Sequence, residues 1–372
     1  MALIEFTEEQ TMLLDTAAEF CRERSPISEV RAGLERPDHD AALWQQMVEL
    51  GWLGIAVPEA HGGLGLGLAG TVPVVEAMGR QLLASPYFAT TLAIHSLNTS
   101  ADEALQGTYL PALAAGGIGT VALVEEDGNW LLEDLNATAT ETDGGFALHG
   151  RKCLVLDAQA ADLLLVSVRL NDAPRLVLVT RDQLPREQLQ REVVVDETRR
   201  SYSVNLDGVV VPSAQLLPGA DFAALEHGAL LLLAAEMSGG LAGVLATIVE
   251  YLTTRKQFDA YIGSYQSLKH PTVDILLAEE AAKSHLYHAA TLLAQGAPTE
   301  DVDTALRIAK AHGSEAFAYA GDRAVQFHGG FGFTYDCDAQ LYLRRALWCQ
   351  HQFGDERHHR QRLAPALLDQ TG

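Results

Sequence analysis

The chain has 372 residues, 48% of them hydrophobic and 20% charged, and a formal net charge of −23. This balance is typical of a folded protein with a sizeable core and two or three domains, and it argues against a disordered chain. The net charge repels nucleic-acid phosphates and anionic lipid head groups, so it also argues against a nucleic-acid-binding protein.

The first part of the chain has the pattern of helices. Apolar residues recur at helical spacing over Thr7–Cys21, and Thr7 with Gln10 can form a capping box. Helical segments are also predicted over Asp40–Leu50 and Val72–Leu83, and helix continues to about Ala115. Residues 1–118 are therefore predicted to form an N-terminal all-helical domain.

The pattern changes after Gly119 to short apolar or alternating runs separated by Asp, Asn, Gly and Pro. Such runs are typical of antiparallel strands, so residues 119–213 are predicted to form a small antiparallel β domain. The predicted strands are Thr120–Val124, Phe146–His149, Leu163–Arg169, Leu176–Thr180 and Val193–Val195.

Long helical patterns return in the last part of the chain, and residues 222–372 are predicted to form a C-terminal four-helix-bundle domain. A block of strands between two helical blocks indicates an α+β multidomain protein with segregated domains. The four predicted helices are Phe222–Thr254, Tyr265–Leu293, Thr299–Phe327 and Ala339–Phe353.

The sequence also bears on location. The most apolar stretch, Gly228–Leu252, contains Glu236 and Glu250, so a buried core helix is expected rather than a membrane span. The acidic N-terminus has no export signal, which makes the cytoplasm the expected location. The four cysteines lack any CxxC spacing, so we expect no metal site and no disulfide framework.

One cluster that can carry chemistry follows the longest apolar helix. Arg255 offers a planar fork suited to a phosphate, Phe258 offers an aromatic face, and Gln266 offers an amide donor and acceptor. Taken singly, each has an ordinary structural interpretation, respectively a helix-end charge, a core aromatic and a capping residue. A cofactor clamp therefore needs support from a second cluster.

The second cluster is the glycine-rich segment Gln326–Phe333, which follows a predicted helix. Glycines at such a position permit positive φ and close backbone approach, and their amides can bind pyrophosphate oxygens. The alternative is a helix C-cap followed by a turn.

These motifs together give the chain a resemblance to the acyl-CoA dehydrogenase family. Each motif is loose alone, but the motifs occur in the family's order across nearly the whole chain. They are Trp44, Gly51-Trp52, Pro58-Glu59 and Gly62-Gly63-Leu64-Gly65; Gly150-Arg151-Lys152; Arg255-x-Gln257-Phe258 with Gln266; and Gln326-x-x-Gly329-Gly330-x-Gly332-Phe333.

The resemblance implies an FAD-dependent oxidoreductase of acyl-CoA thioesters, with the flavin between the β domain and the C-terminal domain. It implies that Arg255 and Gln266 hold the FAD pyrophosphate and neighbouring groups, with Phe258 beside the adenine. It further implies that Gln326, Gly329 and Gly330 reach the FAD of an adjacent subunit, and hence a homo- or hetero-oligomer, either a dimer or a dimer of dimers.

The family's catalytic carboxylate is missing. In the family a glutamate removes the α-proton of the thioester, and its two known positions correspond here to Phe353 and Ala229. Neither residue can accept a proton. Glu226, Glu236 and the nearby Asp355 are weak candidates, with Glu236 interpreted as a buried structural acid and the other two as solvated charges.

The segments that face the flavin ring in the family are also altered, here reading Val124–Asp127 and Cys153–Leu156, and Asp259 replaces a usual glycine. Three functions remain open: a dehydrogenase subunit completed by a related subunit, a non-catalytic partner subunit, and a flavin oxidase or monooxygenase of the same fold. The sequence does not specify the acyl group or the electron acceptor.

Overall fold

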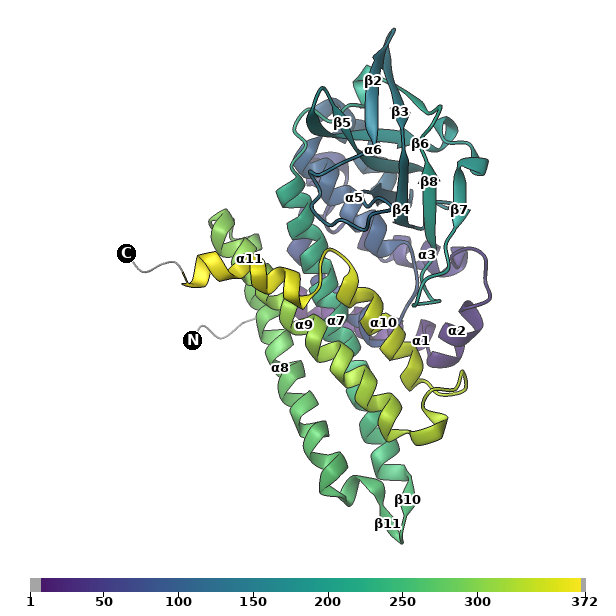
Figure 1. Cartoon of the computed structure of the whole chain (residues 1–372), viewed down its shortest axis with the longest axis vertical. Helices are drawn as coiled ribbons and strands as arrows, with labels where there is room; N and C mark the ends of the chain where they lie inside the picture. Colours follow the sequence, from purple (N-terminus) through teal and green to yellow (C-terminus); the bar gives the residue numbers. More distant parts are fainter. Residues whose placement is uncertain (1–7, 369–372) are drawn as a thin grey trace. The chain divides into compact units, whose positions relative to one another are not determined.

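The computed structural model describes residues 8–368, and the chain divides into two compact units. The helical unit comprises Met1–Leu34, Val72–Leu83 and Leu230–Gly372, and the mixed unit comprises Glu35–Thr71 and Ala84–Ala229. Along the chain, helices precede strands and helices follow them (Figure 1), which confirms the predicted fold class. The three domain ranges 1–118, 119–213 and 222–372 stay a prediction.

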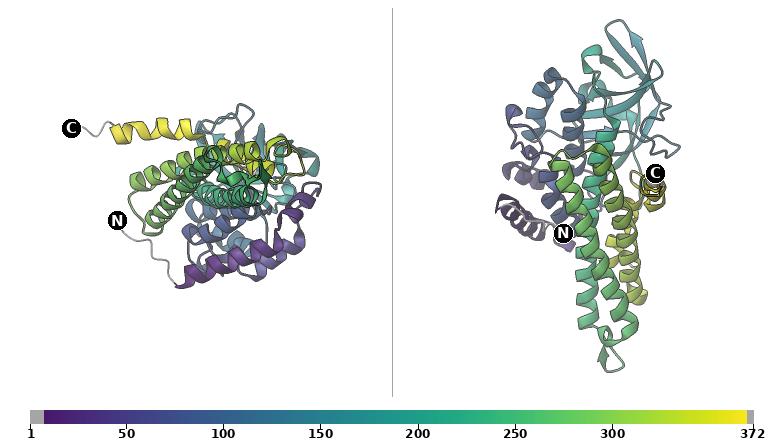
Figure 2. Two further views of the ribbon diagram at one scale, coloured as in Figure 1. Left: turned by 90° about the horizontal axis from the view of Figure 1, so that it is seen from below. Right: turned by 90° about the vertical axis from the view of Figure 1, so that its left-hand side faces the viewer.

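Most of the helical unit is built on α9, against which α8, α10 and α11 each pack (Figures 1 and 2). Helices α7 to α10 lie within a few residues of the four predicted ranges, whereas α11 was not predicted because its sequence is polar and lacks helical apolar spacing. The helices are α1 (Glu8–Arg24), α2 (Ile27–Gly33), α4 (Val72–Arg80), α7 (Phe222–Thr254), α8 (Gln266–Ala294), α9 (Thr299–Phe327), α10 (Ala339–His351) and α11 (Glu356–Leu368).

Helix α7 is the one described helix that is long and apolar enough to cross a membrane by length and composition alone. Of its most apolar 18-residue stretch, 83% is buried inside the protein. Burial of this kind is what a core helix requires. Glycines allow α7 to approach α4: a Cβ on Gly79 would lie 2.2 Å from the carbonyl oxygen of Glu236, and one on Gly239 would lie 1.8 Å from that of Glu76.

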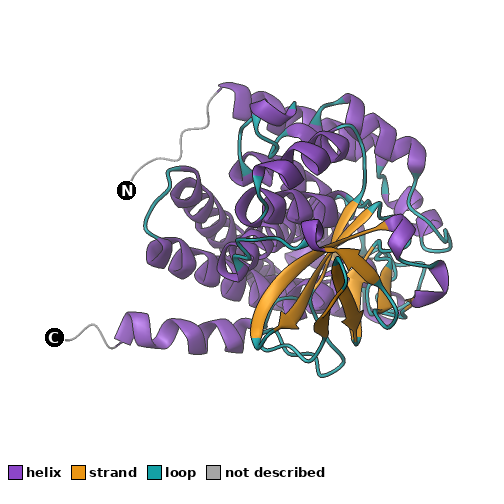
Figure 3. Ribbon diagram, turned by 90° about the horizontal axis from the view of Figure 1, so that it is seen from above, coloured by secondary structure: helices purple, strands orange, loops and turns teal. Residues whose placement is uncertain are grey.

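The mixed unit holds a six-stranded sheet of order β1-β5-β2-β3-β9, in which β6 also pairs with β5, and a three-stranded sheet of order β4-β8-β7. Figure 3 shows the strands in orange. Helix α5 packs on β1, and this unit also contains α3 and α6. The elements are α3 (Ala41–Glu49), α5 (Tyr87–Ser100), α6 (Glu103–Ala114), β1 (Gly119–Ala122), β2 (Thr138–Thr142), β3 (Gly145–His149), β4 (Arg151–Leu156), β5 (Leu163–Leu170), β6 (Ala173–Thr180), β7 (Leu189–Arg191), β8 (Ser201–Asn205) and β9 (Val210–Pro212).

Two details of the predicted strands are wrong. The larger sheet is mixed rather than purely antiparallel, because β5 runs parallel to both β1 and β2. Val193–Val195 is not a strand: pairing of β7 with β8 ends at Arg191, and Val193 is fully exposed. Strands β2, β4, β7, β8 and β9 were not among the predicted strands, although Ser201–Asn205 alternates polar and apolar residues as a half-buried strand does.

Helix α3 begins directly after Asp40, whose carboxylate accepts hydrogen bonds from the amides of Ala42 and Leu43 at the N-terminal end of the helix. This is an N-cap, and it explains why the predicted helix starts there. The capping box predicted for Thr7 lies outside the described residues.

Candidate functional site

Arg255, Phe258 and Gln266 lie in the connection between α7 and α8. There β10 (Lys256–Gln257) pairs with β11 (Ala260–Tyr261) in a hairpin with a two-residue turn. Figure 1 shows this hairpin at the bottom of the view, next to the N-terminal end of α8. All three side chains are exposed, and within residues 8–368 the Arg255 guanidinium has no hydrogen-bond or ion-pair partner.

The turn residues Phe258 and Asp259 both have positive φ, +54° and +61°. A two-residue hairpin loop requires this left-handed conformation, which aspartate tolerates better than most residues. Asp259 therefore adopts the conformation for which a glycine would ordinarily be used, so its presence does not disrupt the turn. Phe258 is 89% exposed, and its ring is available to cover a flat ligand.

The second predicted cluster lies at the end of α9. Gln326 is exposed on the last turn of α9, and Gly329 has a φ of +63°. A Cβ added to Gly329 or Gly330 would meet nothing within 4 Å, so open space lies beside both. Gly332 differs, because a Cβ there would lie 2.1 Å from the carbonyl oxygen of Val325, so this glycine is needed for the turn itself.

A ring stack joins the two clusters. Tyr251, one turn before Arg255, lies with its ring centroid 4.0 Å from that of His328, two residues after Gln326, and the planes are 24° apart. His328 is buried, and its Nδ1 lies 2.7 Å from the carbonyl oxygen of Ala324. Segments that are far apart in the sequence thus meet at one end of the bundle.

The residues of this end of the bundle fit the phosphate and adenine parts of FAD. They include the Arg255 guanidinium, which has no partner among the described residues, an open backbone turn at Gly329-Gly330, and an exposed ring at Phe258. Cationic forks and open glycine turns are groups that bind phosphate, and aromatic rings stack on flat bases.

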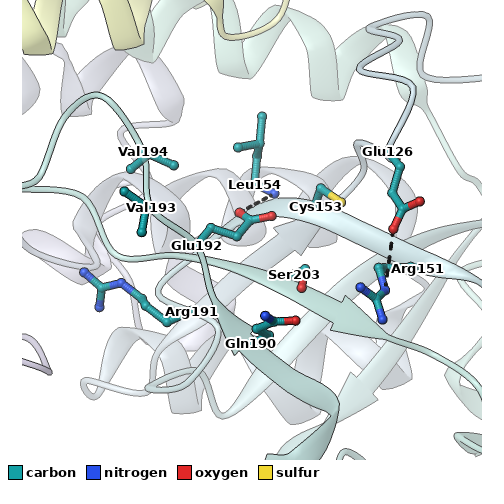
Figure 4. A pocket seen from close by; sticks show the side chains of 10 residues that line it. All are labelled: Glu126, Arg151, Cys153, Leu154, Gln190, Arg191, Glu192, Val193, Val194 and Ser203. Carbon is teal, nitrogen blue, oxygen red and sulfur yellow. Dashed lines mark hydrogen bonds and ion pairs between the residues drawn. The ribbon is translucent and has the colours of Figure 1, made fainter.

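The altered segments of the β region contribute to a pocket in the mixed unit, with a volume of about 530 Å³ (Figure 4). Glu126 comes from one of the predicted ring-facing segments, and Cys153 and Leu154 from the other. The full lining is Glu126, Arg151, Cys153, Leu154, Gln190, Arg191, Glu192, Val193, Val194 and Ser203.

Charged groups of both signs line this pocket. Glu192 accepts hydrogen bonds from the Leu154 amide at 3.0 Å and from Ser201 Oγ at 2.7 Å. Burial, with the nearby carboxylates of Glu192 and Glu126, raises the pKa of the Cys153 thiol. A raised pKa favours the protonated thiol of Cys153 at neutral pH.

At both positions to which the resemblance assigns the family glutamate, the side chain is apolar and buried. Ala229 is completely buried in α7, and Phe353 is 7% exposed in the loop between α10 and α11. Phe353 also has a φ of +55°, which is rare for a bulky residue.

The weak carboxylate candidates are bound in other ways. Glu236 is buried, and its Oε1 lies 2.5 Å from Nη1 of the fully buried Arg345, an ion pair between α7 and α10. Asp355 accepts the His358 amide at 2.8 Å as the cap of α11, and that hydrogen bond lowers its pKa. Glu226 is half-buried on α7.

One feature near Phe353 was not predicted: three buried basic side chains, Arg307, Lys310 and His359, on α9 and α11. Lys310 falls at helical spacing with the apolar residues Leu306 and Phe317, and a lysine on this inner face of α9 is the only sequence signal that pointed to it.

The comparisons with known families agree with this arrangement. Residues 7–117 match the family described as "Acyl-CoA dehydrogenase, N-terminal domain", and residues 222–368 match "Acyl-CoA dehydrogenase, C-terminal domain".

Curated relatives extend over almost the full length. The chain is 29% identical to the acyl-CoA dehydrogenase IpdE2 of Mycolicibacterium smegmatis, covering 96% of this chain and 98% of the relative. It is 30% identical to IpdE2 of Mycobacterium tuberculosis, covering 91% of each chain.

Solved structures give the same result. A chain in the ChsE4-ChsE5 complex from Mycobacterium tuberculosis has a TM-score of 0.90 and 25% identity, with 100% of both chains covered. A chain of a Tcur3481-Tcur3483 steroid acyl-CoA dehydrogenase variant has a TM-score of 0.86 and 27% identity, covering 97% and 98% of the two chains. Sequence motifs, fold and relatives therefore agree that this chain belongs to the acyl-CoA dehydrogenase family of FAD-dependent oxidoreductases.

Proposed function

We propose that this chain is one subunit of a heteromeric acyl-CoA dehydrogenase, in which a related subunit supplies the carboxylate that removes the α-proton. The observation that carries the proposal is the pair of buried apolar residues, Phe353 and Ala229, at both family carboxylate positions. Glu236 cannot substitute without breaking its buried ion pair with Arg345, which would leave an unpaired buried charge.

The chain's part in the complex is to bind FAD and to form the subunit contact. Arg255 and Gln266 would hold the pyrophosphate and neighbouring groups, Phe258 would lie beside the adenine, and Gln326, Gly329 and Gly330 would reach the FAD of an adjacent subunit. When bound, the flavin supplies the acceptor for the β-hydride of the acyl thioester. The exposure of these residues at one end of the bundle supports a ligand or partner that covers them.

The relatives support an assembly of two different chains. The similar structures include one described as a complex of ChsE4 with ChsE5 and one described as Tcur3481-Tcur3483. We further propose that the assembly is a dimer or a dimer of dimers, that it is located in the cytoplasm, and that its substrate is an acyl-CoA. The domain ranges that we propose for this chain are 1–118, 119–213 and 222–372.

The test is to purify the chain alone and then co-expressed with a glutamate-bearing related subunit, measuring flavin per chain and anaerobic bleaching of the flavin by a panel of acyl-CoA thioesters. We expect bleaching only with the co-expressed pair. Full turnover by the chain alone would overturn the proposal. Absence of flavin from every preparation would favour a purely structural subunit, and rapid peroxide formation after reduction would favour an oxidase.

Flavin retention tests the binding residues separately. Arg255→Ala should remove a charge-assisted contact worth roughly 1.5–3 kcal/mol, and Gln326→Ala should remove a weaker one. The matched control is Arg360→Ala, which removes an exposed arginine that is paired with Glu315 in the same unit. Equal flavin occupancy in all three variants would reject the assignment.

A further inference from the structure

Lys310 lies in the middle of α9 and is completely buried. Its Nζ donates hydrogen bonds to three acceptors: Ser314 Oγ at 2.9 Å, the carbonyl oxygen of Gln350 at 3.0 Å and that of Gly354 at 2.8 Å. In its charged form the amine has three hydrogens, one for each acceptor.

Two of these acceptors delimit one short segment of backbone. Gln350 is in the last turn of α10 and Gly354 is in the loop before α11, so a single Nζ joins the two ends of the segment Gln350–Gly354. His359 of α11, which is also buried, packs against the same segment: a Cβ on Gly354 would lie 3.2 Å from its Nε2. Buried basic side chains on α9 and α11 therefore lie against the segment.

The conformation of this segment requires such support. Phe353 and Gly354 have φ values of +55° and +92°, and left-handed backbone at a bulky residue is unfavourable. A Cβ on Gly354 would lie 2.5 Å from Cδ2 of His358, so the loop is also packed tightly against α11. Strain of this kind persists only where surrounding contacts hold it.

The chemistry of Lys310 favours this role over simple filling of space. A methionine would fill a similar volume without the cost of burying an ammonium group. The three acceptors of Lys310 are uncharged, and two of them are backbone carbonyls at the two ends of the segment Gln350–Gly354. What the lysine adds is a fixed position for that loop.

We propose that Lys310 is a positioning residue: it holds Gln350–Gly354 in the conformation that fixes residue 353, the position at which the family places its carboxylate. We call the bonds from Lys310 to the carbonyl oxygens of Gln350 and Gly354 the clamp, and it depends only on contacts within this chain. Its relevance to acyl-CoA chemistry rests on the proposed function, and the experiment separates the two.

The first measurement is amide hydrogen exchange over residues 350–355 in the full-length protein. Lys310→Met should lower protection of these amides at least about tenfold, because the loop loses both carbonyl contacts. The matched control is Ser314→Ala, which removes one acceptor of Lys310 but leaves both bonds to the loop, and it should retain the wild-type protection. A folded Lys310→Met protein with wild-type protection would overturn the proposal.

If Lys310→Met does not fold, the wild-type protein supplies the test through exchange at increasing, sub-denaturing urea. A clamped segment opens only together with α9, so its amides should join the same unfolding step as the α9 amides around residue 310. Exchange of the segment through a separate opening at lower urea would count against the clamp.

The second measurement introduces a base at the held position. In Phe353→Glu, the new carboxylate should remove the α-proton of a saturated acyl-CoA and return deuterium from D2O, which mass spectrometry detects. Adding Lys310→Met should slow this exchange on the order of 100-fold, because a misplacement of about 1 Å has that effect, while acyl-CoA affinity changes little.

The two measurements separate the two ideas. If Phe353→Glu supports no exchange but Lys310→Met still loses amide protection, the link to acyl-CoA chemistry fails and the clamp stands. If the double variant exchanges as fast as Phe353→Glu and loop protection is unchanged, the clamp itself is wrong.

Discussion

Two completely buried lysines, one in each unit, are bound in different ways. Lys152 on β4 donates to a carboxylate, Glu125, at 2.8 Å, and also to Ser167 Oγ and the carbonyl oxygen of Leu123. Lys310 donates only to uncharged oxygens, two of them backbone carbonyls of the segment Gln350–Gly354. In the β region the buried lysine forms an ion pair with a carboxylate. In the helical bundle the buried lysine instead bonds to backbone carbonyls and so fixes a segment of chain.

The pKa values reflect this difference. Burial lowers the pKa of Lys310 to about 7, and only more distant groups oppose it. Burial also lowers the pKa of Lys152, but the hydrogen bond and charge of Glu125 oppose it directly. For Glu125, burial alone would raise the pKa, and the hydrogen bonds from Lys152 and two backbone amides outweigh it and lower the pKa. The same residue type thus stabilises a fold in one region and positions a loop in the other.

The largest expected effect on the free energy of unfolding comes from breaking the ion pair between Lys152 and Glu125. Lys152→Met should lower the free energy of unfolding by about 3–5 kcal/mol, because it leaves Glu125 as an uncompensated buried charge. Urea unfolding followed by circular dichroism at pH 7.5 measures the loss. Adding Glu125→Gln should recover part of it, and a double variant less stable than the single one would contradict this account.

Removing the clamp should cost less. Lys310→Met leaves two carbonyls without a donor but leaves no unpaired charge, so we expect a loss of about 1–3 kcal/mol in the same urea experiment. The comparison between the two lysines fails if Lys310→Met is the more damaging of the two.

Acid should weaken the helical unit through His359. Burial, with Lys310, His358 and Arg307 nearby, lowers the pKa of His359 from its usual 6.5 to about 3. Below pH 6.5 the unfolded chain therefore binds a proton that the native chain does not, so stability falls as the pH drops toward 3, by about 2 kcal/mol at pH 5. His359→Gln should flatten this slope relative to its own stability at pH 7.5, whereas equal slopes in the two proteins would exclude His359 as the cause.

The smallest effect is expected from Ser314→Ala. Ser314 Oγ accepts one bond from Lys310, and both loop carbonyls keep theirs, so the loss should be about 1 kcal/mol. The measurement is again urea unfolding, and a loss equal to that of Lys310→Met would mean that the loop bonds contribute little.

Much of the fold could be read from local patterns. Apolar spacing gave the ranges of α7 to α10 closely, and the turn signals placed the strands between two helical blocks. The motifs around Arg255 and Gln326 identified the family, because they depend on residue types at fixed spacings. Apolar residues at positions 353 and 229 were likewise visible in the sequence, and they led to the prediction that the usual base is missing.

Other features depend on contacts between residues far apart in the chain, which periodicity does not encode. The parallel pairing of β5 with β1 depends on the path of the chain that connects them. The ends of β7 are set by its pairing with β8. The stack of Tyr251 on His328 and the bonds from Lys310 to the loop before α11 form only once the helices pack. The sequence by itself therefore determined the family and the order of its elements, and it predicted that the usual base is missing. Tertiary structure alone decided which buried charges are neutralised and which hold the backbone, because that depends on what each charge meets in the packed core.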